Sequence, residues 1–192
     1  MNQFVLPKLS PFNKIIIIAS VALFLLDSIL SKAADVSLLA LFGLAAGTFL
    51  KGFIWQIFTY PFISRGLLEV VFNCIMMWFI GSELENIWGR KRYVYFLLFS
   101  WLGAGFIYLL VSALFFSSGP VYFLPLTGLA GATSALCLAY AILFPNREFT
   151  FMLLFPMKAK YFCGILIAMS LYQGFFSSSG ALAWGHLGAM LF

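Results

Sequence analysis

Only a few side chains in this chain could take part in chemistry. His186 is the single histidine and so the only imidazole that could act as a base. Glu69 and Asn73 lie four residues apart in an apolar run, which places them on one face of a helix. Residues 127–132 combine a threonine, a plausible helix N-cap, with glycines that permit close backbone approach. In an apolar environment such polar groups indicate a functional site, because their desolvation must be offset.

The composition is that of an integral membrane protein. Of the 192 residues, 64% are hydrophobic and 9% are charged, and the mean hydropathy is +1.05. A soluble domain is roughly 45–50% apolar and about 25% charged. So few charged groups cannot cover a water-soluble globule, which excludes a soluble enzyme and a soluble nucleic-acid binder. The net charge of +5 is therefore interpreted as a topology signal, and no nucleic-acid partner is expected.

The apolar runs predict an all-α protein with six membrane spans in one domain over residues 1–192. The predicted spans are residues 15–30, 66–80, 93–116, 128–143, 161–176 and from 180 onward. The sixth run has only 13 residues, too few to cross a bilayer, so we expect the sequence to be cut short of its natural terminus.

The long connection between the first two spans needs a different interpretation. Its apolar stretches, residues 36–50 and 53–62, are separated by Lys51 and Gly52. Fifteen helical residues reach about 22 Å, whereas the hydrocarbon core is about 30 Å thick. We expect a membrane-embedded loop at the outer interface, with Trp55, Tyr60 and Phe62 as interfacial anchors. A single tilted seventh span is the alternative.

The basic residues predict the orientation. With the N-terminus in the cytoplasm, eight of them lie inside and three lie outside. The inner set is Lys8, Lys14, Arg90, Lys91, Arg92, Arg147, Lys158 and Lys160, and the outer set is Lys32, Lys51 and Arg65. We therefore expect a multi-pass protein of the cell (inner) membrane. The starts of the second, fourth and sixth spans then share one depth at the outer side, which brings His186 toward the first turn of the fourth span.

Several short motifs together resemble the rhomboid family of intramembrane serine proteases. They lie at residues 55–56 (Trp-Gln, where rhomboids usually have Trp-Arg), 73–74, 79–89, 144–147, 156–162 and 186–189. The resemblance runs from about Trp55 to Phe192. It implies a six-helix bundle whose short fourth helix opens into an outward-facing aqueous cavity, with no cofactor. It also implies substrates that are transmembrane segments of other proteins, entering near the fifth span and the first loop.

The same resemblance assigns the site residues. The family's nucleophile motif Gly-x-Ser-Gly reads Gly128-Leu129-Ala130-Gly131 here, so Ala130 stands at the nucleophile position and has no hydroxyl. His186 is the general base, and Asn73 with the Ala130 backbone N–H forms the oxyanion hole. Glu69 stands where rhomboids usually have a histidine, and an ionised carboxylate would repel an oxyanion. Because loss of a serine-protease nucleophile lowers the rate about 10⁶-fold, we expect no proteolysis.

Two explanations of Ala130 remain open. An engineered serine-to-alanine change in an active protease is favoured by Asn73, His186 and the intact glycines. A natural pseudoprotease that binds membrane helices is favoured by Glu69. The sequence inclines toward the first. A channel or transporter is a weaker alternative, because the polar residues cluster at one face and do not line a path through the bilayer.

Simpler roles for the same residues also remain. His186 could be a packing residue, Glu69 could pair with Arg65 one turn earlier, and Asn73 could be an interhelical hydrogen-bond staple. Thr133 and Ser134 are poor substitute nucleophiles, because helix hydroxyls usually bond back to the preceding turn. The cysteines are interpreted as reduced core residues, and no metal cluster is expected; the cysteines are Cys74, Cys137 and Cys163.

Overall fold

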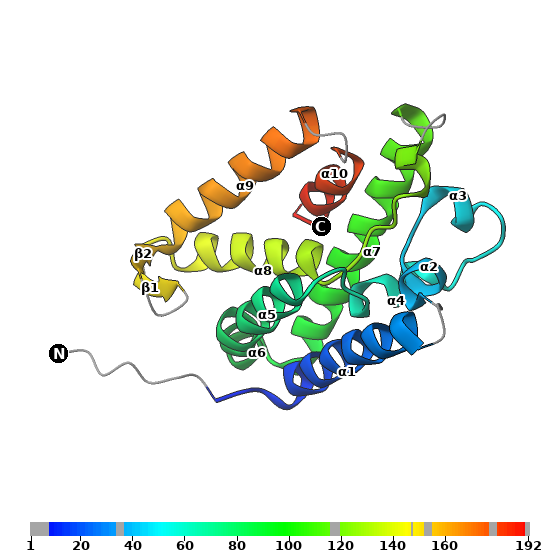
Figure 1. The fold of residues 1–192 in the computed structure, drawn as a ribbon. Coiled ribbons are helices and arrows are strands. Elements are labelled where there is room, and N and C mark those ends of the chain that lie inside the picture. The colour runs from blue at the N-terminus through cyan, green and yellow to red at the C-terminus, as the bar shows by residue number, and fades with distance from the viewer. Residues whose placement is uncertain are drawn as a thin grey trace.

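The structure, a computed structural model, describes residues 8–33, 37–115, 120–146, 148–151, 155–176 and 180–190. It is predominantly helical, as expected (Figure 1). Within these residues three helical stretches are long and apolar enough to cross a membrane: α1 (Pro11–Ala33), the continuous stretch Leu67–Trp88, and α7 (Arg90–Phe115). Three shorter helices lie at the other predicted spans, namely α8 (Ala130–Leu143), α9 (Ala159–Phe176) and α10 (Gly180–Ala189).

The second predicted span is longer than expected. It consists of α5 (Leu67–Met76), one π-helical turn η2 (Met77–Gly81), and α6 (Ser82–Trp88). The prediction that the second span ends at Ile80 is therefore wrong. The helical stretch continues through Gly81, where it packs closely against another helix. A Cβ on Gly81 would lie 2.5 Å from the Tyr93 hydroxyl oxygen, so glycine at this position serves packing and does not break the helix. The chain turns at Gly89, whose φ of +79° is a conformation that favours glycine.

The connection between α1 and α5 is a loop with short helices, not a seventh span. Its elements are α2 (Leu38–Phe42), α3 (Ala46–Phe49), α4 (Gln56–Thr59) and η1 (Tyr60–Phe62). None of them is long enough to cross a bilayer. Two side chains hold the loop together where its backbone groups need partners. Gln56, fully buried, accepts a hydrogen bond from the Thr48 hydroxyl (2.9 Å), and its amide donates to the Leu41 carbonyl (3.4 Å).

The aromatic residues of this loop that were expected as interfacial anchors differ in exposure. Trp55 is 47% exposed, and its indole N–H donates to the Leu41 carbonyl (3.2 Å). Tyr60, in contrast, is only 2% exposed, and its hydroxyl donates to the Trp101 carbonyl of α7 (2.5 Å). The prediction of Tyr60 as an interfacial anchor was therefore wrong. Its aromatic ring fills the core, and its polar end has a buried partner.

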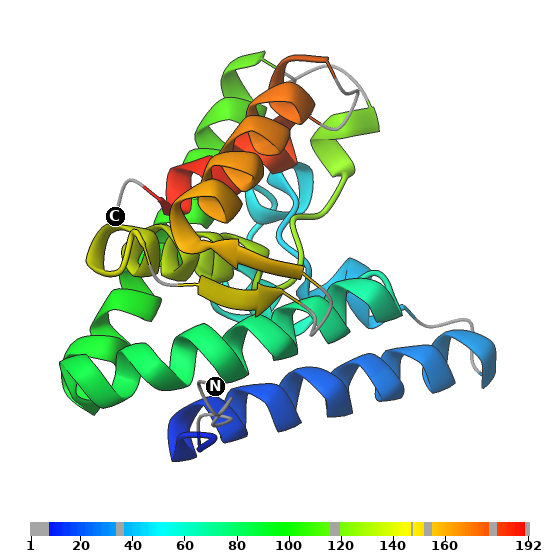
Figure 2. The same cartoon turned by 90° about the vertical axis from the view of Figure 1, so that its left-hand side faces the viewer.

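A buried polar network joins α1 to α6 and α7, and α1 runs alongside the α5–α6 stretch (Figure 2). The Tyr93 hydroxyl donates to the Asn13 amide oxygen (2.7 Å), and the Asn13 amide donates to the Ser10 hydroxyl (3.0 Å). The Ser10 hydroxyl in turn donates to the Glu85 carboxylate. All four residues are buried, so the network fixes the start of α1 by satisfying groups that would otherwise be costly to desolvate.

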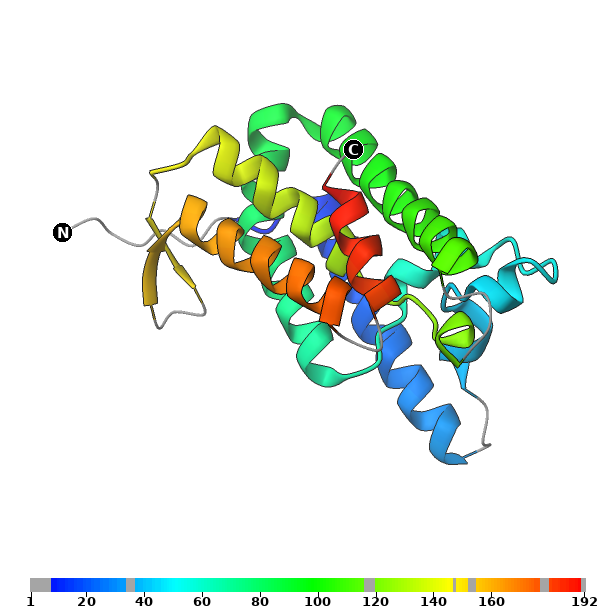
Figure 3. The same cartoon turned by 90° about the horizontal axis from the view of Figure 1, so that it is seen from above.

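Small residues allow α10 to lie between α7 and α9 (Figures 1 and 3). A Cβ on Gly188 would lie 2.5 Å from the Cβ of Ile107 on α7. A Cβ on Gly131 of α8 would lie 2.9 Å from the Ala104 Cβ and 3.3 Å from the Ala189 Cβ. Close backbone approach of this kind is how helices associate in membranes. It brings the start of α8 against α7 and α10.

One short antiparallel hairpin interrupts the helices between α8 and α9. Strand β1 (Glu148–Phe151) pairs with β2 (Phe155–Lys158), and β2 leads directly into α9 (Figure 2). No strand was expected from the sequence; within the described residues, paired extended backbone occurs in this hairpin and in one isolated bridge between Leu44 and Leu126. It lies at the end of α8 that is remote from the candidate site.

Candidate functional site

The site is assembled around Gly128, just before α8. Its φ of +75° is the left-handed region that only glycine adopts without strain, so glycine is required by the backbone itself. The Gly128 N–H donates to the carbonyl groups of Tyr60 (3.0 Å) and Ile63 (2.7 Å) in the first loop. Just before it, Leu126 and Leu44 form an antiparallel bridge with both backbone hydrogen bonds, of 2.7 and 3.0 Å. The first loop therefore fixes the turn that starts α8.

The start of α8 lies two residues later than predicted. The helix begins at Ala130 with Leu129 as its N-cap, and Leu129 provides no side-chain cap. The prediction of Thr127 as the N-cap is therefore wrong. Its hydroxyl instead bonds to the carboxyl group of Glu69. Because the first N–H groups of a helix have no partner within it, the first turn of α8 offers donors at Ala130 and Gly131.

Glu69 and Asn73 face Gly128 from α5. A methyl group at Gly128 would overlap the Glu69 carboxylate oxygen Oε1 and would lie 3.3 Å from Asn73 Nδ2. The other carboxylate oxygen, Oε2, accepts a hydrogen bond from the Arg65 backbone N–H (3.0 Å). This carboxyl group bonds to the backbone just before its own helix and at the same time covers the turn before Ala130. The spacing of four residues thus brings both side chains to one place.

The Asn73 amide is only half satisfied. Its oxygen accepts a hydrogen bond from the Thr133 hydroxyl (3.2 Å), whose single hydrogen is shared with the Ala130 carbonyl (3.1 Å). Its Nδ2 is buried and finds no hydrogen-bond partner among the described residues. Asn73 is only 4% exposed, so this donor has lost its hydrogen bonds to water without gaining a partner, which costs free energy. The hydrogen bond with Thr133 links α5 to α8, which agrees with the simpler role of Asn73 as an interhelical hydrogen-bonding residue.

Arg65 supplies the positive charge of the site. Its guanidinium donates to the Pro125 carbonyl, and its charge acts on both Glu69 and His186. Desolvation lowers the pKa of this guanidinium from its ordinary value, and the neighbouring Glu69 carboxylate acts in the opposite direction. The contact of Arg65 with Glu69 therefore exists, but its hydrogen bond comes from the backbone N–H, not from the side chain.

His186 lies on α10, next to the tight contact between this helix and α7. It is partly exposed and follows Gly185, whose Cβ position lies 3.1 Å from the Tyr108 Cβ. Gly131 of α8 faces Ala189, one turn after His186. The structure thus brings His186 to the side of the bundle where α8 begins, and Arg65 is close enough to act on it electrostatically.

The hydroxyl groups available near the start of α8 are few. Ala130 offers no hydroxyl, and the Thr133 hydroxyl is held by Asn73 and by the preceding helical turn. Arg65 and Thr133 also contribute to the site; the sequence indicated Arg65 only as a pairing partner of Glu69 and Thr133 only as a poor substitute nucleophile. The position of Arg65 four residues before Glu69 indicated in the sequence that the two could interact. For Thr133 the sequence offered only its helical spacing from Ala130. No group of three or more His, Cys, Asp or Glu suitable for a metal ion occurs within the described part of the chain.

The fold and the site define a helical membrane protein with a polar site where one short helix begins between its neighbours. Residues 51–192 match the family model described as the Rhomboid domain. The match covers most of the chain, which therefore belongs to the rhomboid family. A relative, the Rhomboid-like protein 19 of Arabidopsis thaliana, is 26% identical over 132 residues. These residues cover 67% of this chain and 42% of the relative, so the chain spans less than half of the relative's length.

Proposed function

We propose that this chain is a non-catalytic rhomboid that binds a transmembrane segment of another membrane protein without cleaving it. The observation that carries the proposal is the position of the Glu69 carboxyl group against Gly128, directly before the alanine at position 130. Two independent steps of rhomboid-type hydrolysis are affected. Ala130 removes the nucleophile, and Glu69 places a carboxyl group beside the donor that would stabilise an oxyanion.

The second effect follows from charge and geometry. Glu69 Oε1 and Asn73 Nδ2 both border the space beside Gly128. An oxyanion that formed there would accept a hydrogen bond from Asn73 and would at the same time be repelled by an ionised Glu69. Because preorganised donors are worth about 10²–10³ in rate each, a carboxylate among them is unfavourable for the reaction. Restoring a serine at position 130 would leave this second obstacle in place.

The same groups remain able to bind an uncharged peptide group. The buried Asn73 Nδ2 lacks a partner among the described residues, and α8 presents the N–H groups of its first turn. The carbonyl oxygens of a locally unwound transmembrane segment are acceptors that need such donors, because an unpaired carbonyl in the bilayer is costly. We therefore assign Asn73 and the Ala130 N–H to binding, with Gly128 and Gly131 allowing the close approach. His186 and Arg65 border the site.

The proposed setting is a bundle of six spans in the cell (inner) membrane. Helices α1, α7, α8, α9 and α10 with the α5–α6 stretch supply them. The distribution of eight basic residues against three supports a cytoplasmic N-terminus, which would open the site to the outer face.

A second candidate is an active protease whose serine was replaced by Ala130. It is favoured by Asn73, which keeps a free donor beside Gly128, and by His186 on the adjoining helix. Glu69 distinguishes the two candidates, because a change made only to remove the nucleophile would not require it.

Binding can be measured with the full chain in nanodiscs and fluorescent single-span peptides that carry a Gly-Ala stretch in their outer half. The variant Asn73→Leu removes the free donor, and Asn86→Leu, at an exposed position of α6, is the matched control. Loss of one net hydrogen bond of about 1–1.5 kcal/mol should weaken binding roughly 5–13-fold. The proposal is contradicted if no peptide binds, or if both variants weaken binding equally.

A further inference from the structure

An apolar groove of about 340 Å³ lies between the first loop and α7, away from the site around Gly128. One wall consists of Phe49, Leu50 and Ile57, and the other includes Phe106, Leu110 and Ala113 of α7. Leu50 is 68% exposed and Phe106 is 57% exposed, so the groove opens outward and is not a cavity of the core. No residue of this groove takes part in the site described above.

The size of the groove distinguishes between possible occupants. A helix with its side chains is about 10–12 Å across, so 340 Å³ would hold less than one turn of it. A hydrocarbon chain is much thinner. If a methylene group takes roughly the 30 Å³ of a water molecule in the liquid, the groove has room for about ten of them. The volume therefore favours one acyl chain over a transmembrane helix.

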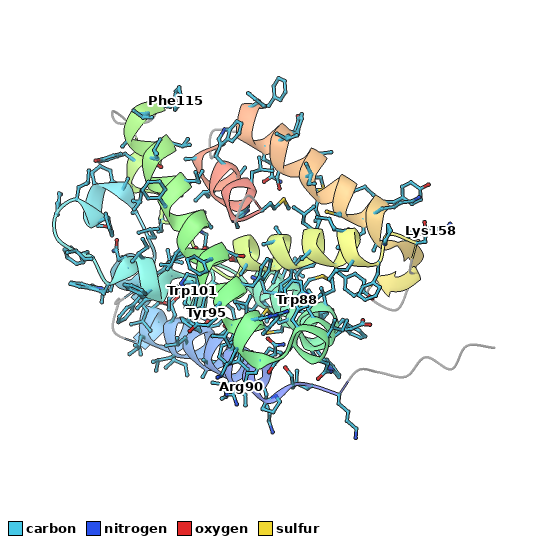
Figure 4. The ribbon with its side chains drawn as sticks, turned by 180° about the vertical axis from the view of Figure 1, so that it is seen from behind. Trp88, Arg90, Tyr95, Trp101, Phe115 and Lys158 are labelled. Atoms are coloured by element: carbon cyan, nitrogen blue, oxygen red, sulfur yellow. The ribbon has the colours of Figure 1, made fainter. Side chains whose placement is uncertain are left out.

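The depth of the groove suits one leaflet of a bilayer. Arg90 and Phe115 lie at opposite ends of α7 (Figure 4), and the groove residues of α7 belong to the half that ends at Phe115. From Phe106 to Phe115 the helix rises roughly 14 Å, about half of a hydrocarbon core of about 30 Å. An acyl chain in the groove would thus carry its headgroup near the Phe115 end of α7.

The rim of the groove carries the matching charge. Lys51 follows Leu50 directly, is exposed, and holds its ammonium group 5.6 Å from the centre of the Phe123 ring. The sequence from residue 36 to residue 66 contains two basic residues, Lys51 and Arg65, and no acidic one. An ammonium group at the edge of an apolar groove complements the phosphate of a lipid headgroup.

We propose that this groove binds one phospholipid, with an acyl chain between the first loop and α7 and its phosphate at Lys51. The occupant would join two elements that already touch, because Gly105 of α7 packs against Leu44, Ile57 and Tyr60 of the loop. This site is independent of the proposed function and does not require a bound membrane partner.

Native mass spectrometry of the full chain in detergent can test the acyl part of the proposal. The added lipid is phosphatidylglycerol of defined chain length. Ala113→Trp fills the groove, and Ala168→Trp, at an exposed position of α9, is the matched control. We expect one retained lipid per chain, a roughly tenfold loss in Ala113→Trp, and no change in Ala168→Trp, with both variants eluting as folded protein. Equal retention in all three proteins overturns the proposal.

The phosphate part is tested by competition against diacylglycerol with the same chains. Lys51→Gln should lower the preference for the phospholipid severalfold, whereas Lys91→Gln, an exposed cation at the other end of α7, should not. An unchanged preference in Lys51→Gln overturns the assignment of the phosphate. A dimer mass that disappears in Ala113→Trp, in place of a lipid mass, would show that a second copy of the chain occupies the groove and would also overturn the proposal.

Discussion

Substitution of Gly128 by alanine probes the centre of the site. Two effects add at this residue. Its φ of +75° is left-handed, a conformation that costs an L-residue roughly 1–2 kcal/mol. A methyl group would also overlap Glu69 Oε1, so the carboxyl group must move. That movement breaks the hydrogen bond from the Arg65 N–H, and a hydrogen bond to a charged group contributes about 1.5–3 kcal/mol. Gly128→Ala should therefore lower the free energy of unfolding by about 2.5–5 kcal/mol.

The two contributions can be separated with matched variants. Gly52 has a φ of +106° and nothing within 4 Å of its Cβ position, so Gly52→Ala reports backbone strain alone, about 1–2 kcal/mol. Glu69→Ala removes the group that a methyl at Gly128 would strike. In that background Gly128→Ala should cost only the strain, which gives a coupling of about 1.5–3 kcal/mol between the two positions.

The assay is equilibrium unfolding of the four proteins of this cycle and of Gly52→Ala in mixed detergent micelles. The reasoning is refuted if Gly128→Ala lowers the free energy of unfolding by the same amount with and without Glu69. It is also refuted if Gly52→Ala is as destabilising as Gly128→Ala, because the contact with Glu69 would then contribute nothing.

Two further predictions concern the packing of the bundle. Tyr93→Phe leaves the buried Asn13 amide oxygen without its donor and should lower the free energy of unfolding by about 1–3 kcal/mol, while Tyr95→Phe, at an exposed position, should change it by less than about 0.5 kcal/mol. Gly188→Ala should destabilise α10 through its contact with the Cβ of Ile107, and Ile107→Gly, which removes that Cβ, should relieve this effect in detergent unfolding; an additive double variant would contradict it.

The helices were predictable from the sequence where long apolar runs determine them. Helices α1 and α7 lie close to the expected ranges, and the split at Lys51 and Gly52 correctly indicated a loop in place of a seventh span. The continuation through Gly81 could not be predicted, because the reason for this glycine is its contact with Tyr93 from another helix. The buried position of Tyr60 depends in the same way on the Trp101 carbonyl of α7.

The sequence indicated which residues lie near Gly128 better than it indicated which hydrogen bonds they make. The spacing of Glu69 and Asn73 indicated one helix face, and both side chains do face Gly128. The roles assigned to His186 and Ala130 came from resemblance and stay predictions. The hydrogen-bond partner of each polar group depends on how the helices pack against one another. Asn73 pairs with Thr133 of α8, a contact sixty positions away in the chain that no local pattern contains.

The most direct test of a non-catalytic rhomboid is cleavage of a transmembrane reporter in liposomes by single and combined variants. The proteins to compare are the chain itself, Ala130→Ser, Glu69→His, and the combination of these two changes, with the combination plus His186→Ala as control. The account predicts no cleavage by the chain or by either single variant. It predicts cleavage by the combination, which restores both the hydroxyl and the family's residue opposite Asn73, and none by the control. Cleavage by Ala130→Ser alone would contradict it and would make the chain a protease that lacks only its serine.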